Sequence, residues 1–521
     1  MYMRKMFKPG NAFVKACTFS TQLFIVIGLA FSIAGCSKKD NPSGSSSTQN
    51  TSTIDSTAIT SATPVGLNGT GADPSDLVEN STFSSTVSIN FGATVSITNP
   101  LSGSGVSIVQ TGSDIVITST VSQVEYQLSG TTTNGSVKIY STNKFELNLN
   151  NVSITSSSGP AINIQTSKTA YVVIADGTTN TLVDAVTYPT STEDQKGTLC
   201  SVGQIVFSGT GNLTVTGNNK HAIVSDQYIR VRSGNITVTG AVKDAMHSSD
   251  YFIVDGGTLN LTASDDGIEC DEGYIIINDG TFNINSVSHG ITASYDSGDK
   301  TIVPYFTING GTIKATVSAG EGIQCKNVLT INNGNITTTS TDDGMNADTA
   351  IYINNGSLYL TSSANDGMES NGIVTITGGK TVAIGSQVAK NGVNCGNRAF
   401  KITGGLVLGT GAETSEPTAN ISTINSVIMG AGTANQLIHI EAANGTEALT
   451  FLSPGAFNTM LYACSKLKAG TTYNVYTGGS VSSKNTSFNG LYTSGTYTKG
   501  TKTGSFTTSS VVTQTGGTLN N

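Results

Sequence analysis

A repeat of about 23 residues is the feature of this sequence that most restricts its fold. A turn glycine precedes a short apolar stretch in SGNITVT, GGTLNLT and DGTFNIN, and it recurs at nearly constant spacing between residues 211 and 405. A second column of small residues, each following an acidic residue, a histidine or an asparagine, keeps the same period. Self-similarity at a fixed period is the signature of a repeat architecture. The first column comprises Gly211, Gly234, Gly257, Gly280, Gly311, Gly334, Gly356, Gly379 and Gly405, and the second comprises Ala222, Ala245, Gly267, Gly290, Gly322, Gly344, Gly367 and Gly392.

Each repeat contains three short segments with the character of strands. In one repeat they occupy residues 267–270, 274–278 and 281–285, and each is too short for a helix and alternates apolar with polar or small residues. Three strands in every 23 residues predict an all-β, single-stranded parallel β-helix, in which each strand pairs with its equivalent in the next coil. We expect the right hand, by the preference of parallel crossover connections. A propeller is the competing architecture, but its blades repeat about every 40–45 residues.

The first residues of the chain are expected to be a lipoprotein signal peptide. Residues 1–35 begin with basic side chains, continue with LFIVIGLAFSIAG and end before Cys36, a pattern that resembles a bacterial lipobox. Cleavage there would leave Cys36 to carry the lipid, whereas an ordinary secretory signal or a retained membrane anchor are the alternatives. We therefore expect a protein of the bacterial cell envelope, attached by lipid to the outer membrane on its periplasmic or outer face.

Composition and period predict the remaining boundaries. Residues 36–80 are rich in Ser, Thr, Asn and Gly and are expected to form a flexible tether. The β-helix is expected over residues 137–415. Residues 81–136 are expected to form an N-terminal β cap and residues 416–521 a C-terminal β segment, because the end of a solenoid is otherwise an open edge.

The net charge excludes one class of partner. The chain has a formal charge of −8, and residues 1–35 contribute four positive charges and no acid, so the processed chain would be more acidic still. Binding to nucleic acid depends on Lys and Arg contacts with phosphates. We therefore expect no nucleic-acid partner, and we expect a monomer.

Acidic residues recur in the turns before the second column, in SDDGIECDEG, STDDGMNADT and ANDGMESNG. Stacked coils are about 4.8 Å apart, and two carboxylates at that distance repel by roughly 1 kcal/mol in water and by more where they are partly buried. Ca²⁺ lies about 2.3–2.6 Å from its oxygen ligands, so an ion between two coils could bind both acids. The alternative is turn chemistry alone, with Asp capping the turn and Gly taking a positive φ. The predicted calcium ligands are Asp244, Asp265, Asp266, Glu269, Glu321, Asp342, Asp343, Asp366 and Glu369.

Two further columns carry polar and aromatic side chains. Parity with the arginines of YIRVR (228–232) predicts that a column of tyrosines faces solvent, where the rings could stack on sugars. A ladder that only stiffens the sheet is the alternative. Another column, two positions before the turn glycine, is expected to form a structural ladder of hydrogen-bonded amides. The tyrosines are Tyr228, Tyr251, Tyr274 and Tyr305, with Tyr295 added from an insertion, and the amide column comprises Asp255, Asn278, Asn309, Asn332 and Asn354.

The histidines His221, His247 and His289 are assigned to separate columns, and the sequence therefore predicts no transition-metal site.

Several stretches resemble a family of exported bacterial β-helix proteins described as carbohydrate-binding domain-containing, which are similar in fold to polysaccharide lyases. The resemblance covers roughly residues 115–510 and rests on VEYQLSGTTTNGSVKIYSTNKFELNLNNVSITSSSGPAINIQ, YVVIADGTTNTL, EDQKGTL, the D-G-[IM] coils, FLSPGAF and YNVYTGGS. It implies binding of plant-type polysaccharide, cellulose-like or pectin-like, with calcium held by acidic turns. The residues carried over are Asp244, Asp266, Glu321, Asp343 and Asp366.

Two other functions remain open from the sequence. A calcium-dependent lyase acting on uronate-containing glycans would pair the ion with a Lys or Arg base that abstracts the α-proton. Near the acidic turns Lys326 is the basic side chain in a suitable position, and this scarcity favours binding without catalysis. A purely structural surface adhesin is the third possibility.

Overall fold

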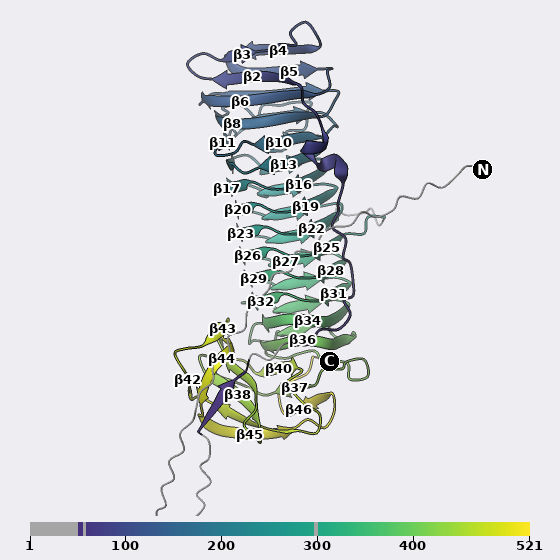
Figure 1. Ribbon diagram of the computed structural model, residues 1–521, viewed down its shortest axis with the longest axis vertical. Coiled ribbons are helices and arrows are strands. Elements are labelled where there is room, and N and C mark those ends of the chain that lie inside the picture. The colour runs from purple at the N-terminus through teal and green to yellow at the C-terminus, as the bar shows by residue number, and fades with distance from the viewer. Residues whose placement is uncertain (1–49, 56–58, 296–300, 521) are drawn as a thin grey trace, which may run out of the picture. The chain divides into compact units, whose positions relative to one another are not determined.

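The computed structural model describes residues 50–55, 59–295 and 301–520. The regular secondary structure of these residues is almost entirely β, and strands of consecutive coils pair in parallel and in register (Figure 1). Tyr251 pairs with Tyr274, for example, and Tyr274 pairs with Tyr305. The parallel β-helix that the period predicts is confirmed. Cys36 and the predicted signal peptide lie outside the described residues.

Three sheets run along the solenoid, and each regular coil contributes one strand to each of them. Sheet 1, a continuous sheet of 13 strands, contains β15 (His221–Ser225), β18 (Met246–Ser248), β21 (Ile268–Cys270), β24 (Ile291–Ala293), β27 (Ile323–Cys325), β30 (Met345–Ala347), β33 (Met368–Ser370) and β35 (Val393–Asn394). Sheet 2 contains β16 (Tyr228–Val231), β19 (Tyr251–Val254), β22 (Tyr274–Ile277), β25 (Tyr305–Ile308), β28 (Val328–Ile331) and β31 (Ala350–Ile353). Sheet 3 contains β17 (Asn235–Ala241), β20 (Thr258–Thr262), β23 (Thr281–Ser286), β26 (Thr312–Val317), β29 (Asn335–Ser340) and β32 (Ser357–Ser362).

The coils at the two ends use longer strands that continue from sheet 2 into sheet 3. These are β6 (Val124–Thr132), β8 (Phe145–Thr155), β34 (Ile373–Ile384) and β36 (Phe400–Gly411). The other strands of the first coils are β2 (Ser85–Phe91), β3 (Ser96–Thr98), β4 (Val106–Thr111), β5 (Ser113–Ser119), β7 (Gly135–Ser141), β9 (Ile162–Gln165), β10 (Ala170–Ile174), β11 (Thr179–Val183), β12 (Gly197–Ser201), β13 (Ile205–Gly209) and β14 (Asn212–Gly217). Parallel pairing already begins between β2 and β6, and only β3 and β4 pair antiparallel to their neighbours.

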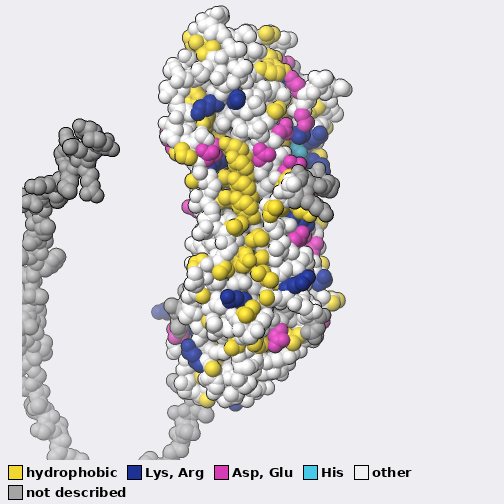
Figure 2. Space-filling view, turned by 90° about the vertical axis from the view of Figure 1, so that its right-hand side faces the viewer, with side chains coloured by type: hydrophobic (Ala, Val, Ile, Leu, Met, Phe, Trp, Pro, Cys, Tyr) yellow, Lys and Arg dark blue, Asp and Glu magenta, His cyan; other side chains and the backbone are white. Residues whose placement is uncertain are grey.

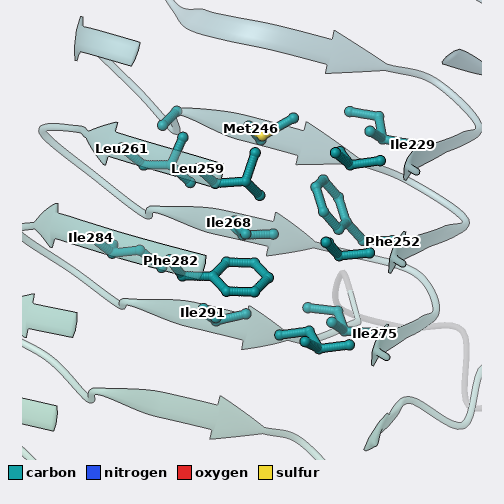
Figure 3. Close-up of a cluster of buried hydrophobic side chains, with 14 of the residues drawn as sticks. Ile229, Met246, Phe252, Leu259, Leu261, Ile268, Ile275, Phe282, Ile284 and Ile291 are labelled. Carbon is teal, nitrogen blue, oxygen red and sulfur yellow. The ribbon is translucent and has the colours of Figure 1, made fainter. Parts of the chain in front are cut away.

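The core is formed by one side chain in two from each strand, as the period-2 geometry of strands requires. Phe252 of sheet 2, Phe282 of sheet 3 and Ile268 of sheet 1 are fully buried. Figure 3 shows such side chains from the three sheets pointing into the interior of the solenoid. Burial of each side chain of this size contributes about 1.5–3 kcal/mol, and the coils therefore stabilise one another only when they are stacked.

The chain before the first coil lies against the solenoid and the C-terminal sheet. β1 (Thr51–Ile54) pairs antiparallel with β44 (Leu491–Thr498). Residues 59–80, here called the N-terminal segment, then run along sheet 2 and include the short 3-10 helices η1 (Pro74–Asp76) and η2 (Val78–Asn80), drawn in purple in Figure 1.

The amide column holds this segment in place. Asn278 donates both to the Asp255 carboxylate (2.8 Å) and to the carbonyl of Thr70 (2.9 Å). Asn309, Asn332 and Asn354 repeat the pattern, each donating to the preceding column residue and to a carbonyl of the N-terminal segment. The predicted ladder is therefore confirmed. The path of residues 59–80 differs from the flexible tether expected from composition, because side chains 200 or more positions later bind their backbone.

The C-terminal part covers the last coil. β37 (Ser426–Met429), β40 (Thr459–Cys464) and β46 (Val512–Gln514) continue from β36, partly in antiparallel pairing. A separate antiparallel sheet contains β1, β38 (Leu437–Ala442), β39 (Glu447–Leu452), β41 (Thr472–Thr477), β42 (Ser480–Val481), β43 (Thr486–Phe488), β44 and β45 (Thr501–Thr507). Within the described ranges we found no helix with the length and apolar character needed to cross a membrane.

Candidate functional site

The acidic turns form two parallel columns at the start of sheet 1. The backbone N–H of Gly344 donates to the carbonyl of Asp366 in the next coil (3.0 Å), and that of Gly267 donates to the carbonyl of His289 (3.0 Å). These bonds place equivalent residues of successive coils directly above one another. The first column comprises His221, Asp244, Asp266, His289, Glu321, Asp343, Asp366 and Asn391, and the second comprises His247, Glu269, Thr292, Gln324, Asn346, Glu369 and Asn394.

The glycine that follows the first column is required by close packing. A Cβ at Gly290 would lie 2.3 Å from the carbonyl oxygen of Gly322, and a Cβ at Gly267 would lie 2.3 Å from Ile284. A positive φ is recorded for the turn glycines such as Gly280 (φ 121°), but not for Gly267 or Gly290. The explanation of the D-G motif by a positive φ is therefore wrong. The small residue lets the acidic turn approach the next coil and sheet 3.

The two oxygens of Asp244, Asp343 and Asp366 have different partners. Oδ1 of Asp343 accepts the backbone N–H of Asp366 (2.9 Å), and Oδ1 of Asp244 accepts that of Asp266 (3.1 Å). This hydrogen bond joins consecutive coils, and it is one reason why aspartate recurs at this position of the repeat. Oδ2 is directed instead to the second column, where its partner differs from coil to coil. The chemistry of the site therefore depends on the second column.

Three carboxylates come together at Asp343, Asp366 and Glu369, here called the carboxylate cluster. Their oxygens lie within 4.8 Å of one another, and Asp343 and Asp366 are buried. Asn346 donates to Asp343 and Glu369 (2.9 and 3.0 Å), and Asn394 donates to Asp366 and Glu369 (2.7 and 2.9 Å). Among the residues that the structure describes, no Lys, Arg or His forms an ion pair with the cluster.

Burial and mutual repulsion affect the protonation of the carboxylate cluster. Burial, together with the neighbouring Glu369, raises the pKa of Asp343 to about 8. Burial also raises the pKa values of Asp366 and Glu369 above their ordinary range. A divalent cation bound here would favour the ionised carboxylates, since an opposite charge at this distance stabilises the charged form.

Histidines neutralise the acids at the other end of the columns. Asp266 and Glu321 flank His289, at 2.8 and 3.1 Å from its two ring nitrogens. Burial lowers the pKa of His289, but these two contacts outweigh it and raise the pKa to about 10. His289 therefore already supplies the positive charge that was expected from calcium beside Asp266 and Glu321.

The histidines do not occupy three separate columns as expected, because His221 and His289 both lie in the first column. His221 and His247, in adjacent columns, contact the same carboxylate. Their Nδ1 atoms lie 2.9 and 3.0 Å from Oδ2 of Asp244, because the two columns are adjacent and the residues belong to neighbouring coils. Glu269 and Asp271 also contact His247, at 3.2 and 3.4 Å.

The acids beside the columns are arranged differently. Asp265 forms an ion pair with Lys243 (2.9 Å), and its carboxylate lies within 4.8 Å of those of Asp244 and Asp266. Asp342 accepts a hydrogen bond from Asn365 and is not part of the carboxylate cluster. The nine predicted acids therefore form several local environments, not one continuous ladder of equivalent sites.

The tyrosine column forms a stack along the solenoid axis. Successive ring centroids are 4.2, 4.9 and 4.6 Å apart and the ring planes differ by 12°, 3° and 5°. The rings therefore cover one another's faces, which leaves edges and hydroxyl groups, and this favours the stiffening ladder over a platform for sugar rings. Tyr228 is only 8% exposed because η1 covers it and its hydroxyl donates to Asp76, so the expectation of solvent exposure is wrong there. Tyr295 is 42% exposed and is not in the stack.

Figure 2 shows one side of the molecule, on which a hydrophobic band and a charged patch are both visible. A band of hydrophobic side chains runs along the solenoid, and beside it lies a patch of Asp, Glu, Lys, Arg and His side chains. The visible histidine belongs to the acidic columns, because His439 is fully buried.

The N-terminal segment adds contacts that the periodic pattern does not contain. Asp76 is buried beside Arg230 (3.2 Å), which also pairs with Asp255 (2.7 Å). An open cavity of about 780 Å³ lies between η2 and sheet 2, and Glu146 and Arg232 are among its lining residues. Burial, with the neighbouring Glu125, raises the pKa of Glu146 to about 7. A periodic search misses these residues because their partners occur once in the chain.

Comparison with known proteins gives the family. The model of a family described as carbohydrate-binding domain-containing protein matches residues 111–367 and 305–452. A search of curated proteins found no significant match. A solved structure of the polysaccharide lyase-like protein from C. thermocellum, a gadolinium derivative, is 22% identical, with a TM-score of 0.34, and the match covers 56% of this chain and 96% of that one. Because the two family matches together span more than half of the sequence, the chain belongs to the family of carbohydrate-binding domain-containing proteins.

Proposed function

We propose that this protein binds an acidic, plant-type polysaccharide without cleaving it, and that Ca²⁺ at the carboxylate cluster takes part in binding. The observation that carries the proposal is the group of three carboxylates at Asp343, Asp366 and Glu369, which has amide partners but no cationic one among the described residues. Membership of the carbohydrate-binding family supports the choice of ligand.

Calcium chemistry fits this group of residues. Ca²⁺ takes about six to eight oxygen ligands from carboxylates, amide oxygens and water. The three carboxylates supply fewer than this, so other positions would remain for water and for a carboxylate of a uronate residue. Glu369 is the partly exposed member of the cluster, and its amide partner Asn394 is partly exposed as well.

The proposal favours binding over the lyase alternative. Cleavage would need a base beside the ion, and Lys326, the candidate base, makes no hydrogen bond or ion pair with the carboxylate cluster. Lys243 is paired with Asp265. Burial raises the pKa values of Asp366 and Glu369, and Lys390 lies close enough to oppose this rise, but it forms no ion pair with the carboxylate cluster.

A glycan-retention experiment tests this proposal. In affinity electrophoresis through polygalacturonate, the protein should be retarded in millimolar calcium and not in EGTA, because the ion would join the two sets of carboxylates. Asp366→Asn should weaken retardation about tenfold or more, whereas Asp342→Asn, in the same repeated motif but outside the carboxylate cluster, should leave it unchanged.

Other outcomes of this experiment distinguish the alternatives. Retardation that ignores calcium and Asp366→Asn would contradict the calcium-dependent mode. An unsaturated product absorbing in the ultraviolet would establish the lyase, and retention by neither polygalacturonate nor cellulose would favour the structural adhesin.

We also propose that Cys36 carries a lipid that attaches the protein to the bacterial envelope. The chain from Cys36 to Asn50 has 14 steps and can span at most about 50 Å, and β1 then pairs with β44. Cys36→Ser should move the protein from the membrane to the soluble fraction after cell lysis, and unchanged membrane association would contradict the proposal.

A further inference from the structure

A second cluster on the same columns has a different ligand chemistry. His221, Asp244 and His247 offer two imidazole nitrogens and one carboxylate oxygen, all within 4.8 Å of one another. Their side chains are 13%, 2% and 12% exposed. The cluster lies four coils from the carboxylate cluster, which is about 19 Å at the spacing of stacked strands.

The two imidazoles converge on a single oxygen. Nδ1 of His221 and Nδ1 of His247 lie 2.9 and 3.0 Å from Oδ2 of Asp244, and the ring centroids are 4.5 Å apart. Oδ1 of Asp244 is already used by the backbone N–H of Asp266, which fixes the orientation of the carboxylate. The three ligand atoms are thus positioned by backbone pairing between coils.

His221 provides an independent observation. Its Nδ1 is buried and has no hydrogen-bond partner of acceptable geometry, although Oδ2 of Asp244 lies 2.9 Å away. A buried polar atom without a directional partner is costly. A cation shared by the three atoms would give Nδ1 of His221 a directional partner.

We propose that His221, Asp244 and His247 bind a divalent transition metal of the zinc class. A tetrahedral metal with bonds of about 2.0–2.2 Å to nitrogen and oxygen has its ligand atoms about 3.3–3.6 Å apart, so small shifts would admit it between the present positions. Imidazole ligands suit Zn²⁺, Ni²⁺ and Cu²⁺, whereas Ca²⁺ prefers oxygen alone.

Neighbouring carboxylates complete the site. Oε2 of Glu269 lies 3.2 Å from Nδ1 of His247 and can supply a fourth ligand in place of water. Nε2 of His247 lies 3.4 Å from Oδ2 of Asp271. A carboxylate on the far nitrogen of a metal-bound histidine fixes its tautomer and orientation, and loss of such a partner lowers metal affinity about 10–100-fold.

The test uses the purified, untagged protein after removal of metals with EDTA. Titration calorimetry with ZnCl₂ should show one saturable site at pH 7.5, and Co²⁺ should give visible absorption bands of a nitrogen- and oxygen-ligated ion. His221→Gln and His247→Gln should each weaken Zn²⁺ binding at least about tenfold, and Asp271→Asn should weaken it about 10–100-fold. Glu79→Gln, which changes a surface carboxylate outside the columns, is the matched control and should leave Zn²⁺ binding unchanged.

The outcomes separate this site from the proposed calcium site. Loss of Zn²⁺ binding in the histidine variants, with folding checked by circular dichroism, supports the assignment whether or not calcium binds elsewhere. If one histidine variant does not fold, the other and the Co²⁺ spectrum of Asp271→Asn give the same comparison. Absence of saturable Zn²⁺ binding, or equal affinity in the parent and both histidine variants, would overturn it.

Discussion

In EGTA, the melting temperature of the protein should fall by roughly 5 °C or more as the pH is raised from 5 to 8.5, and millimolar calcium should reverse most of this fall. The expected cause is the carboxylate cluster of Asp343, Asp366 and Glu369. Burial raises the pKa values of all three, that of Asp343 to about 8 with a contribution from Glu369.

The sign follows from proton linkage. Asp343 in the unfolded chain has an ordinary pKa of about 3.9. Between about pH 4 and pH 8 the folded protein therefore binds more protons than the unfolded one. Stability therefore decreases as the pH rises through this window. The contribution is fully present below the unfolded pKa and is lost as the pH passes the folded pKa. A shift of this size corresponds to on the order of 5 kcal/mol.

Calcium should oppose this loss because it binds the ionised form in the folded protein only. A ligand at 100 times its dissociation constant stabilises by about 2.7 kcal/mol. The comparison of melting curves in EGTA and in calcium at each pH gives the effect directly by differential scanning calorimetry.

The variant Asp343→Asn distinguishes the contribution of the carboxylate cluster to the pH dependence of stability from that of other titrating groups. The pKa values of His247 and His289 are also raised, to about 11 and about 10, so both add a loss of stability at rising pH. The variant should be more stable than the parent in EGTA at pH 8 and should gain nothing from calcium. Equal pH dependence of the variant and the parent in EGTA, or a full calcium effect in the variant, would contradict this interpretation.

The solenoid and its columns could be predicted from sequence because both depend on the period alone. Once strands pair in parallel, residues one period apart become neighbours, and Asp343 and Asp366 had to lie in consecutive coils. The inward positions of Phe252 and Phe282 follow from strand alternation in the same way.

Contacts between neighbouring columns could not be predicted in this way. The shared carboxylate of His221 and His247 joins positions that differ in both coil and column, and side-chain rotamers decide whether such residues meet. The stacking of Tyr251 on Tyr274 likewise depends on ring orientation, which parity does not specify. Parity shows only that a side chain faces outward.

The N-terminal segment was missed for a different reason. Its composition is that of a flexible linker, and nothing in residues 59–80 is periodic. The path of the segment is determined by the side chains that bind it. Each amide of the asparagine column has two N–H donors, and the ladder uses only one of them. Carbonyl groups of the segment accept the other, as Val65 does from Asn354 (2.8 Å).

Asp76→Ala should release the N-terminal segment from the solenoid and should cost about 3–5 kcal/mol of local stability, the usual cost of breaking a buried ion pair on one side. Asp76 is 1% exposed, and its two oxygens contact the hydroxyl of Tyr228 and the guanidinium of Arg230. Removal of the carboxylate leaves that hydroxyl without its partner, and Arg230 keeps its pair with Asp255 and its hydrogen bond to the carbonyl of Gly71 (2.7 Å).

Hydrogen exchange measured by mass spectrometry should report this release as faster exchange in residues 59–80, while strands β22 and β25 keep their protection. Glu79→Ala is the matched control, because its ion pair with Arg232 (2.7 Å) involves a carboxylate that is 57% exposed, and such pairs contribute about 0–1 kcal/mol. Similar exchange in the Asp76 and Glu79 variants would show that Asp76 does not hold the segment.

The same variant tests what the N-terminal segment covers. Gly71 lies over Ile253 and Ile276, which face outward from sheet 2 but are each only 1% exposed. If the segment is released, these side chains and Tyr228 become accessible, so the variant should bind a hydrophobic dye that the parent and Glu79→Ala do not bind. Faster exchange without dye binding would mean that the segment loosens at η1 but remains attached through the asparagine column, whose hydrogen bonds are independent of Asp76.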